Sequence, residues 1–303
     1  MTQSIGIGVP VFNGEDYLAE CLDSIAAQDY EPLDVLISDN ASSDATRDIS
    51  MEFVERDTRF RYVCQPQNLG AAGNYNYVMT HSNGSLYKVA AHDDVVGQGF
   101  LRLCADALEA HPEAVLSFPR TRYIDAEGKP TDDYEHPIVW THATSPSGRL
   151  HDLLVDDHWS YLHLCYPVMG VMRRQAAVGT RGIQAFKGSD KAMLMELALM
   201  GDFIEVPEPL YLKRLHDNTS MRAHTTGEEF DLWYDPDNAG RDPMPVSRLT
   251  RSHLSAVWRD DLTAAERARC TFEVTRWLFR QRRWRVAGSE LRNAARKRVS
   301  PAS

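Results

Sequence analysis

The segment Leu86-Tyr87-Lys88-Val89-Ala90-Ala91-His92-Asp93-Asp94 leads from a mostly apolar run into two adjacent carboxylates, and the residues after it, 95–99, predict a turn. Such a run is typical of a buried strand. Carboxylates at a strand end suit Mg²⁺ or Mn²⁺, which prefer oxygen ligands and often bridge carboxylates to phosphates. A metal–nucleotide site is one hypothesis. The alternative is that the pair only caps a helix that begins near Phe100.

Strand and helix patterns alternate through the N-terminal part of the chain. Runs of apolar and β-branched residues predict strands, and apolar residues spaced three and four apart predict helices between them. The expected strands are 5–11, 33–38, 61–64, 86–93 and 115–118. This alternation favours a largely parallel sheet with helices on both faces. Ligands of such sheets bind beyond the carboxyl ends of the strands, where Asp39, Asn68 and the Asp93-Asp94 pair are expected.

Composition narrows the function classes. The chain has 303 residues, 43% of them hydrophobic, which suits a protein with a substantial core. A formal net charge of −10 argues against bulk binding of nucleic acid. No stretch of about 20 apolar residues predicts a membrane-spanning helix, and the first residues do not resemble a secretory signal. Five scattered cysteines fit a reduced, cytoplasmic protein better than a zinc site.

The rest of the chain is less regular and then changes character. Prolines and a glycine interrupt 121–187, for which we expect loops, a helix over 151–163 and a strand over 168–172. Further strands are expected at 203–206 and 210–212. Beyond Glu228 a Pro- and Asp-rich linker leads to a helical tail in which arginines alternate with Trp277, Phe279 and Trp284. This tail has three interpretations: a helix packed on the preceding domain, a homodimer contact, or a surface that touches anionic membrane.

Six short motifs follow one another in a set order. They are 9–14 (Val-Pro-Val-Phe-Asn-Gly), 38–44 (Ser-Asp-Asn-Ala-Ser-Ser-Asp), 67–70 (Gln-Asn-Leu-Gly), 92–94 (His-Asp-Asp), 188–190 (Gly-Ser-Asp) and 214–216 (Arg-Leu-His) followed by Ser220. In this order the chain resembles family 2 glycosyltransferases of the GT-A fold over about residues 4–221. The resemblance implies an α/β fold with a single Rossmann-like, mostly parallel sheet flanked by helices. It implies a GT-A domain at 1–227, divided into a nucleotide-binding half (about 1–120) and an acceptor-binding half (121–227), followed by a linker and basic helical extension at 228–303.

The resemblance also implies inverting transfer of a sugar from a nucleoside-diphosphate donor to an acceptor hydroxyl. Asp39 matches the carboxylate that reads the base, although an Asx turn is its structural alternative. Pro10, Phe12 and Asn13 match the strand end that lines the base pocket, and Phe12 could equally be core. Asn68 and Gly70 match a loop near the nucleoside, or form a plain turn.

For the metal and diphosphate, the resemblance implies Asp94 as the ligand of Mn²⁺ or Mg²⁺ and Asp93 as a residue near the ribose. His216 matches a histidine that contacts diphosphate or metal, with Arg214 close enough in sequence to assist. Its alternative is an exposed loop position beside Asp217. The family's acidic motif varies at the position of His92, which we leave out of the ligand set. A bound cation would neutralise the departing diphosphate.

Asp190 matches the general base that takes the proton of the acceptor hydroxyl. Its structural alternative is a helix N-cap, a role that Ser189 could share. A helix N-terminus also stabilises a charged carboxylate, so the two roles are compatible.

Several assignments stay open at this point. A UDP-sugar is the first candidate donor, and dTDP- and GDP-sugars are alternatives. The acceptor could be a glycan, a lipid-linked or a small-molecule glycoside, and the expected location is cytoplasmic, including the inner face of the membrane. A nucleotidyltransferase that makes sugar nucleotides is the enzymatic alternative, although no Gly-rich loop bearing Lys or Arg follows the first strand. A non-catalytic sugar-nucleotide-binding protein is the other.

Overall fold

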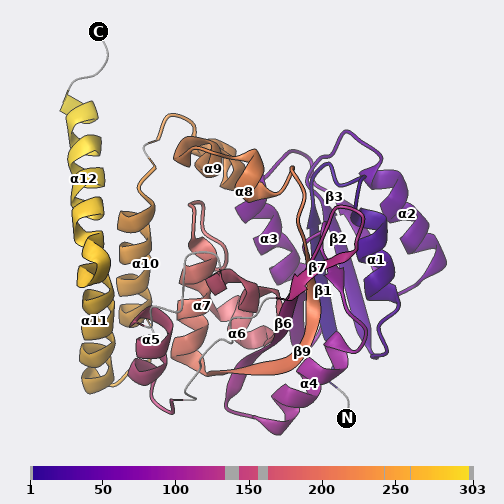
Figure 1. The fold of residues 1–303 in the computed structure, drawn as a ribbon, viewed down its shortest axis with the longest axis horizontal. Coiled ribbons are helices and arrows are strands. Elements are labelled where there is room, and N and C mark those ends of the chain that lie inside the picture. Colours follow the sequence, from indigo (N-terminus) through magenta and orange to yellow (C-terminus); the bar gives the residue numbers. More distant parts are fainter. Residues whose placement is uncertain (1–2, 134–142, 156–162, 242, 260, 300–303) are drawn as a thin grey trace.

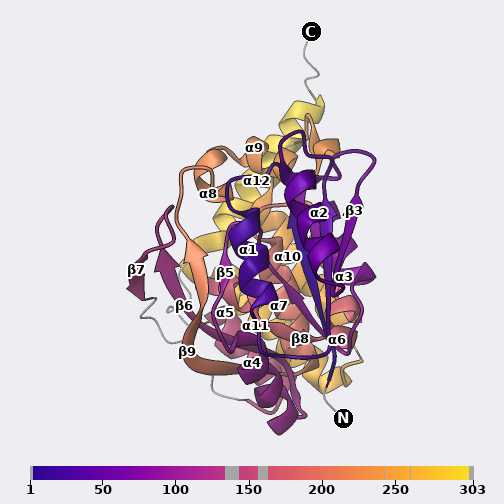
Figure 2. The same ribbon diagram turned by 90° about the vertical axis from the view of Figure 1, so that its right-hand side faces the viewer.

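A computed structural model describes residues 3–133, 143–155, 163–241, 243–259 and 261–299 of the chain. One curled sheet runs through the molecule with helices on both faces (Figures 1 and 2). Its strands are β1 (Ile5–Val11), β2 (Leu33–Asp39), β3 (Phe60–Cys64), β4 (Leu86–Val89), β5 (Val95–Val96), β6 (Ala114–Ile124), β7 (Pro130–Asp133), β8 (Val171–Arg173) and β9 (Asp202–Arg214).

The helices follow the strands in an alternating order through the first half of the chain. They are α1 (Leu18–Ala26), α2 (Thr46–Arg56), α3 (Gly70–His81), α4 (Phe100–Ala110), α5 (Pro146–Val155), α6 (Arg174–Gly179), α7 (Ser189–Met200), α8 (Ser220–Ala223), α9 (Gly227–Tyr234), α10 (Pro245–Arg259), α11 (Ala264–Phe279) and α12 (Arg283–Val299). Short 3₁₀ segments occupy His163–Met169, Pro236–Asn238 and Arg280–Arg282.

The strand order is β3-β2-β1-β4-β8-β6-β9-β5, with β7 paired to β6. The first four strands are mutually parallel, as the alternation of strands and helices predicts. Beyond them β8 runs antiparallel to both neighbours, while β6 and β9 are parallel. The predicted α/β class is confirmed, and the antiparallel pairings lie in the second half of the sheet.

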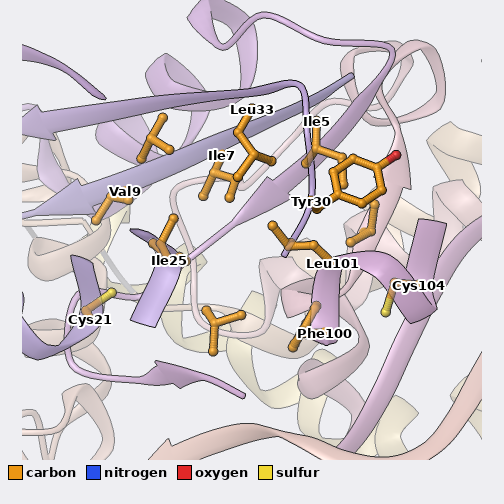
Figure 3. Packing of buried hydrophobic residues seen from close by; sticks show 14 of the residues in the cluster. Ile5, Ile7, Val9, Cys21, Ile25, Tyr30, Leu33, Phe100, Leu101 and Cys104 are labelled. Carbon is orange, nitrogen blue, oxygen red and sulfur yellow. The ribbon is translucent and has the colours of Figure 1, made fainter. Parts of the chain in front are cut away.

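Two apolar layers form the core on opposite faces of the sheet. On one face Ile5, Ile7 and Val9 of β1 pack with α1 and α4, as Figure 3 shows. On the other face Val78 of α3 lies against Gly8, where an added Cβ would be only 2.5 Å from Cβ of Val78. A side chain at this position would therefore separate α3 from β1.

Three local predictions in the middle of the chain differ from the structure in the bounds of the elements. The expected strand at 168–172 is a 3₁₀ helix up to Met169, and only Val171–Arg173 pair as a strand. The expected helix at 151–163 begins earlier, at Pro146, and continues to Val155, after which 156–162 lie outside the described residues. The two short strands expected around Pro207 and Pro209 are a single strand, β9, whose pairing with β6 contains register shifts.

The C-terminal helices pack on the preceding domain (Figure 1). Helix α11 lies against α5, α10 against α7, and α12 against α10 and α11. Ala256, Val257, Cys270 and Val274 are buried in the same apolar cluster as residues of α7 and β4. This supports the packing interpretation for α10 and α11. Among the described residues, no helix is both long and apolar enough to cross a bilayer.

Candidate functional site

A pocket of about 430 Å³ opens beyond the carboxyl ends of the parallel strands. It is built from the segments that follow β1, β2, β3 and β4 and from the chain that leaves β9. Of the predicted site residues it brings together Pro10, Phe12, Asn13, Asn68, Asp93 and His216. Phe12 is 44% exposed, which excludes the alternative that it is a core residue. We refer to this space as the donor pocket.

Hydrogen bonds between loops give the donor pocket its shape. The Asn13 side chain accepts from the backbone N–H of Ser43 (2.9 Å), which ties the loop after β1 to the loop after β2. The Asn40 amide donates to Asn68 Oδ1 (2.9 Å), and Asn40 Oδ1 accepts from the backbone N–H of Leu69 (2.8 Å). Three consecutive loops are thus held together by asparagine side chains, two of which the sequence motifs contain as predicted site residues.

Asp39 is not among the residues that line the pocket. It is buried, and its two oxygens accept from the backbone N–H of Ser42 (2.8 Å) and the hydroxyl of Tyr62 (2.7 Å). The bond to Ser42 reaches three residues along the loop after β2, one residue further than the Asx turn that the sequence allowed as an alternative. The next residue, Asn40, lines the pocket.

Gly70 begins α3 with φ of +72°, a conformation that favours glycine. A Cβ at this position would be 2.4 Å from the carbonyl oxygen of Tyr234, at the end of α9. The glycine therefore permits the close approach of α9 to α3. Its expected role beside the nucleoside stays a prediction.

Asp93 and His216 form the polar pair inside the donor pocket. His216 Nε2 lies 3.0 Å from Oδ2 of Asp93, and the ring of Tyr17 lies 4.7 Å from the His216 ring, centroid to centroid. Lys213 Nζ is 3.9 Å from the same carboxylate. Burial alone would raise the pKa of Asp93, but Lys213 and the hydrogen bond from His216 hold it well below its usual range. Asp93 is thus ionised at neutral pH.

Asp94 points away from the pocket into a buried network. Its oxygens accept from the hydroxyl of Tyr211, from Lys213 Nζ (3.1 Å) and from the backbone N–H of Arg214 (3.0 Å). Burial raises the pKa of Asp94 and Lys213 opposes this rise, while Asp94 raises the pKa of Lys213 above its ordinary value. Both carboxylate oxygens of Asp94 already have donors, and Asp93 is the carboxylate that faces the pocket, so the geometry favours Asp93 as the metal ligand. Metal ligation by Asp94 stays a prediction.

Arg214 is likewise structural in this arrangement. Its side chain is 1% exposed and donates to the carbonyl oxygens of Asp93 (2.9 Å) and Ala126 (3.0 Å) and to Glu20 (2.5 Å). It fixes the turn that carries Asp93, and its predicted contact with diphosphate has no support in this geometry. The capping alternative for the acidic pair is also wrong, because α4 is preceded by Gly99 and neither aspartate caps it.

Asp190 lies in the first turn of α7, and Gly188 occupies the N-cap position. One carboxylate oxygen accepts from the backbone N–H of Lys191 (2.9 Å). Asp190 lines a second pocket, also of about 430 Å³, which adjoins the donor pocket. Both pockets are lined by Ala71, Tyr75, Met169, Lys213 and Trp233. The predicted base and the Asp93–His216 pair therefore face neighbouring spaces with a common wall.

The residues present can contribute two ligands to a divalent cation. Within the described residues, no group of three or more His, Cys, Asp or Glu side chains converges on one point. An ionised Asp93 beside His216 still fits Mg²⁺ or Mn²⁺, since such ions are often held by one or two protein groups and completed by substrate phosphates and water. The two residues therefore fit a divalent cation only together with a ligand that carries phosphate groups.

Sequence reasoning missed several residues that line these pockets. Lys213 stands one position before the predicted Arg214, and the alternation of side chains along β9 could have indicated that the two point to opposite sides. Tyr17 is the N-cap residue of α1, next to the apolar face of that helix. Tyr75 and Trp233 come from α3 and α9, and no local pattern marks either of them.

Comparisons with known proteins agree with this arrangement. Residues 6–177 match the model of the family described as glycosyl transferase family 2. Glycosyltransferase GlyG of Streptococcus pneumoniae is 25% identical over 242 residues, which are 77% of this chain and 76% of that protein. The matched segment spans only 14% of the length of glycosyltransferase GlyA of Streptococcus pneumoniae and 38% of the length of the uncharacterized protein Mb1547 of Mycobacterium bovis.

Solved structures share the fold at low sequence identity. A crystal structure of residues 1–349 of S. aureus TarS in complex with UDP-GlcNAc has a TM-score of 0.63 at 14% identity and covers 91% of this chain and 72% of that fragment. The structure of the mannosyltransferase PcManGT from Pyrobaculum calidifontis, in complex with GDP-Man and Mn²⁺, has a TM-score of 0.52 at 15% identity. The match covers 100% of this chain and 89% of PcManGT. The matched family model extends over more than half of the chain, from β1 into α6, and on this basis the chain belongs to glycosyl transferase family 2.

Proposed function

We propose that this protein is an inverting glycosyltransferase that moves a sugar from a nucleoside-diphosphate sugar to an acceptor hydroxyl. One observation carries the proposal: an ionised carboxylate–histidine pair and a second carboxylate, Asp190, face two adjoining pockets that share Lys213. The donor pocket lies at the strand ends where α/β sheets bind ligands. Each pocket has the volume of a small-molecule site.

The nucleoside is assigned to the donor pocket between Phe12 and the asparagine loops. An exposed aromatic ring can pack against a base, and Asn13, Asn40 and Asn68 supply amide groups for hydrogen bonds. Structures with the same fold bind UDP-GlcNAc and GDP-Man. A UDP-sugar is the first candidate, with dTDP- and GDP-sugars as alternatives.

Asp93 and His216 are the residues that would hold Mg²⁺ or Mn²⁺, and the cation would supply positive charge to the leaving diphosphate. Lys213 adds a second positive charge at the boundary of the two pockets. Its ammonium is kept protonated by Asp94 and Asp93, which raise its pKa. We propose that Lys213 helps to stabilise negative charge on the diphosphate as the sugar departs.

Asp190 is proposed to accept the proton of the attacking hydroxyl. Inversion requires a base on the side of the sugar opposite the diphosphate, and Asp190 lines the pocket that adjoins the donor pocket. The N-terminus of α7 stabilises its negative charge. The proton passes to a carboxylate oxygen as the new glycosidic bond forms and the bond to the diphosphate breaks.

A donor screen tests this function. The protein is incubated with UDP-, dTDP- and GDP-sugars, with Mn²⁺ and with chelator, and nucleotide release is measured. One donor should stabilise the fold and be hydrolysed slowly in a metal-dependent manner, because a ligand that binds only the folded state raises its stability. Absence of any donor binding contradicts the proposal. Pyrophosphate release from a sugar 1-phosphate and a nucleoside triphosphate would identify the nucleotidyltransferase alternative.

We also propose that the surface of α11 and α12 contacts an anionic membrane. Phe279, Trp284 and Leu291 are 61%, 44% and 57% exposed. Residues 276–299 contain nine arginines and lysines and one glutamate, in a chain whose formal net charge is −10. Exposed aromatic and basic side chains on helical segments are typical of interfacial helices. A homodimer through this surface is the alternative, and both would suit a cytoplasmic enzyme at the inner face of the membrane.

A further inference from the structure

The second pocket has two chemically different ends. At one end Lys187, Asp190 and Lys191 are partly exposed side chains. At the other end Met79, Tyr87 and Met172 line the same space, and each is at most 6% exposed to solvent. The pocket therefore extends from the proposed base into the apolar layer between the sheet and helices α3 and α7.

The apolar end is poorly suited to a sugar ring. Burying a hydroxyl without a hydrogen-bond partner is costly, and a sugar carries several hydroxyls. Apolar cavities of about 150 Å³ in other proteins stay dry and bind ligands as small as benzene, and this pocket measures about 430 Å³. Methionines such as Met79, Met172 and Met193 adapt to ligands of different shape.

Helix α9 contributes aromatic side chains to the wall of the pocket. Phe230 and Trp233 of α9 line the pocket, and Phe230 is 3% exposed. Lys187 Nζ lies 4.0 Å from the centre of the Phe230 ring, so α9 packs at the end of the pocket that carries the charged side chains. A molecule that fills the pocket would thus have its polar part near Asp190 and its apolar part among Met79, Tyr87 and Met172.

We propose that the acceptor is amphipathic: its accepting hydroxyl lies at Asp190, and an alkyl or aryl group attached nearby fills the apolar end of the pocket. This inference rests on the proposed function for the identity of the reaction, and it excludes a free, fully hydroxylated oligosaccharide as the preferred acceptor. An isoprenoid or acyl chain and an aromatic aglycone share this chemistry. The two are distinguished by the probes below.

Binding is measured with three glucosides that share one head group: methyl, octyl and phenyl β-glucoside, each below its micelle concentration and without donor. Octyl or phenyl glucoside should bind at least about tenfold tighter than methyl glucoside, since each buried methylene adds to the transfer free energy. A preference for octyl indicates a chain-bearing acceptor, and a preference for phenyl indicates an aryl one. Equal affinity for all three overturns the proposal.

Ile183→Trp is the matched test of location. Ile183 lines the pocket and is only partly buried, so a larger side chain can occupy the space without displacing a core residue. It should remove the preference for octyl or phenyl glucoside while nucleoside-diphosphate binding in the donor pocket is retained. Val178→Trp is the control, because Val178 is 38% exposed on α6 and does not line the pocket.

Two results separate failure of this inference from failure of the proposed function. If the donor is bound and hydrolysed but Ile183→Trp keeps the full preference for the apolar glucosides, these ligands bind elsewhere and the inference is wrong. If no nucleotide sugar binds at all, the proposed function fails whatever the glucosides do.

Discussion

The imidazole of His216 lies 3.0 Å from the carboxylate of Asp93, although 123 positions separate the two residues in the chain. The turn after β4 supplies Asp93, and the segment that leaves β9 supplies His216. Two elements that are distant in sequence thus meet at one wall of the donor pocket, beside Lys213. This contact and the buried network around Asp94 predict that substitutions of the two adjacent carboxylates have different effects.

Asp93→Asn and Asp94→Asn should have different effects. Asp93→Asn should abolish the Mn²⁺-dependent increase in donor affinity with a small change in stability. Asp94→Asn should cost about 3–5 kcal/mol of unfolding free energy, because it leaves the Lys213 ammonium without its closest counter-charge. Urea denaturation and nucleotide titration with and without Mn²⁺ measure both. If Asp94→Asn folds normally and loses metal dependence, the assignment made from sequence is correct instead.

Asp190→Asn tests the base. The amide keeps the size of the side chain but cannot accept a proton, so kcat for transfer should fall by about 10²–10⁴-fold. Donor affinity should stay unchanged, because Asp190 does not line the donor pocket. Lys191→Ala, at the neighbouring position, is the control for disturbance of the start of α7. Wild-type turnover in the Asp190 variant would require a different base.

His253 should make the protein sensitive to acid. It is buried, packs edge-on against Trp277 at 5.2 Å, and has no hydrogen-bond partner at Nδ1, while burial lowers its pKa to about 3. The unfolded chain protonates this histidine near pH 6.5, so between pH 6.5 and 3 the unfolded state binds more protons. Stability should therefore fall by about 1.4 kcal/mol for each pH unit below 6.5.

His253→Leu should reduce this slope. Denaturant titrations at pH 5.0 and pH 7.5 measure the difference, and His111→Leu is the control because the His111 side chain is 48% exposed. A slope that is the same in wild type and in His253→Leu would mean that the histidine is protonated in the folded protein.

Gly70→Ala and Gly99→Ala together distinguish backbone strain from steric collision as causes of lost stability. Both glycines have positive φ, so alanine introduces backbone strain of about 1–3 kcal/mol at either position. Only at Gly70 does the new Cβ also collide with backbone, at Tyr234 of α9. Gly70→Ala should therefore be less stable than Gly99→Ala and should weaken nucleotide binding as α9 moves. Equal losses in the two variants would show that α9 does not depend on this contact.

Arg285→Glu tests the membrane surface. Arg285 lies beside Trp284 on α12, with its guanidinium carbon 5.3 Å from the ring centre. Each basic residue near an anionic bilayer contributes about 1 kcal/mol, so the reversal should weaken sedimentation with anionic vesicles several-fold, and added salt should weaken it further. Arg47→Glu, on the exposed face of α2, is the control. Absence of binding to anionic vesicles, together with a molecular mass in solution that rises with protein concentration, would favour the dimer instead.

The parallel part of the sheet could be predicted because each of its strands and helices has a strong local pattern. The apolar face of α1, formed by Leu18, Cys21, Leu22 and Ile25, is buried as its spacing predicts. The middle of the chain was harder, because Pro167 and Gly170 interrupt an apolar run that tertiary packing divides between a 3₁₀ helix and β8. Strand β9 contains two prolines, which interrupt the apolar pattern, so the sequence predicts two short strands where the structure has one.

The donor pocket was partly predictable because its loops follow strands in a fixed order. What could not be predicted is which of two adjacent aspartates faces the pocket, since that depends on Tyr211 and Lys213 more than 100 positions later. The second pocket combines side chains from α3, β4, α7 and α9. Its apolar character is a property of the packed layers, and no single segment of the chain displays it.

The common wall of Tyr75, Lys213 and Trp233 has a kinetic consequence. A molecule in either pocket touches side chains that a molecule in the other pocket also touches. The two substrates should therefore not add independently: saturating one should change the apparent Michaelis constant of the other, and a dead-end analogue of the acceptor should alter the rate at which nucleotide leaves. The side chains that lie between the two pockets therefore couple the binding of one substrate to the binding of the other.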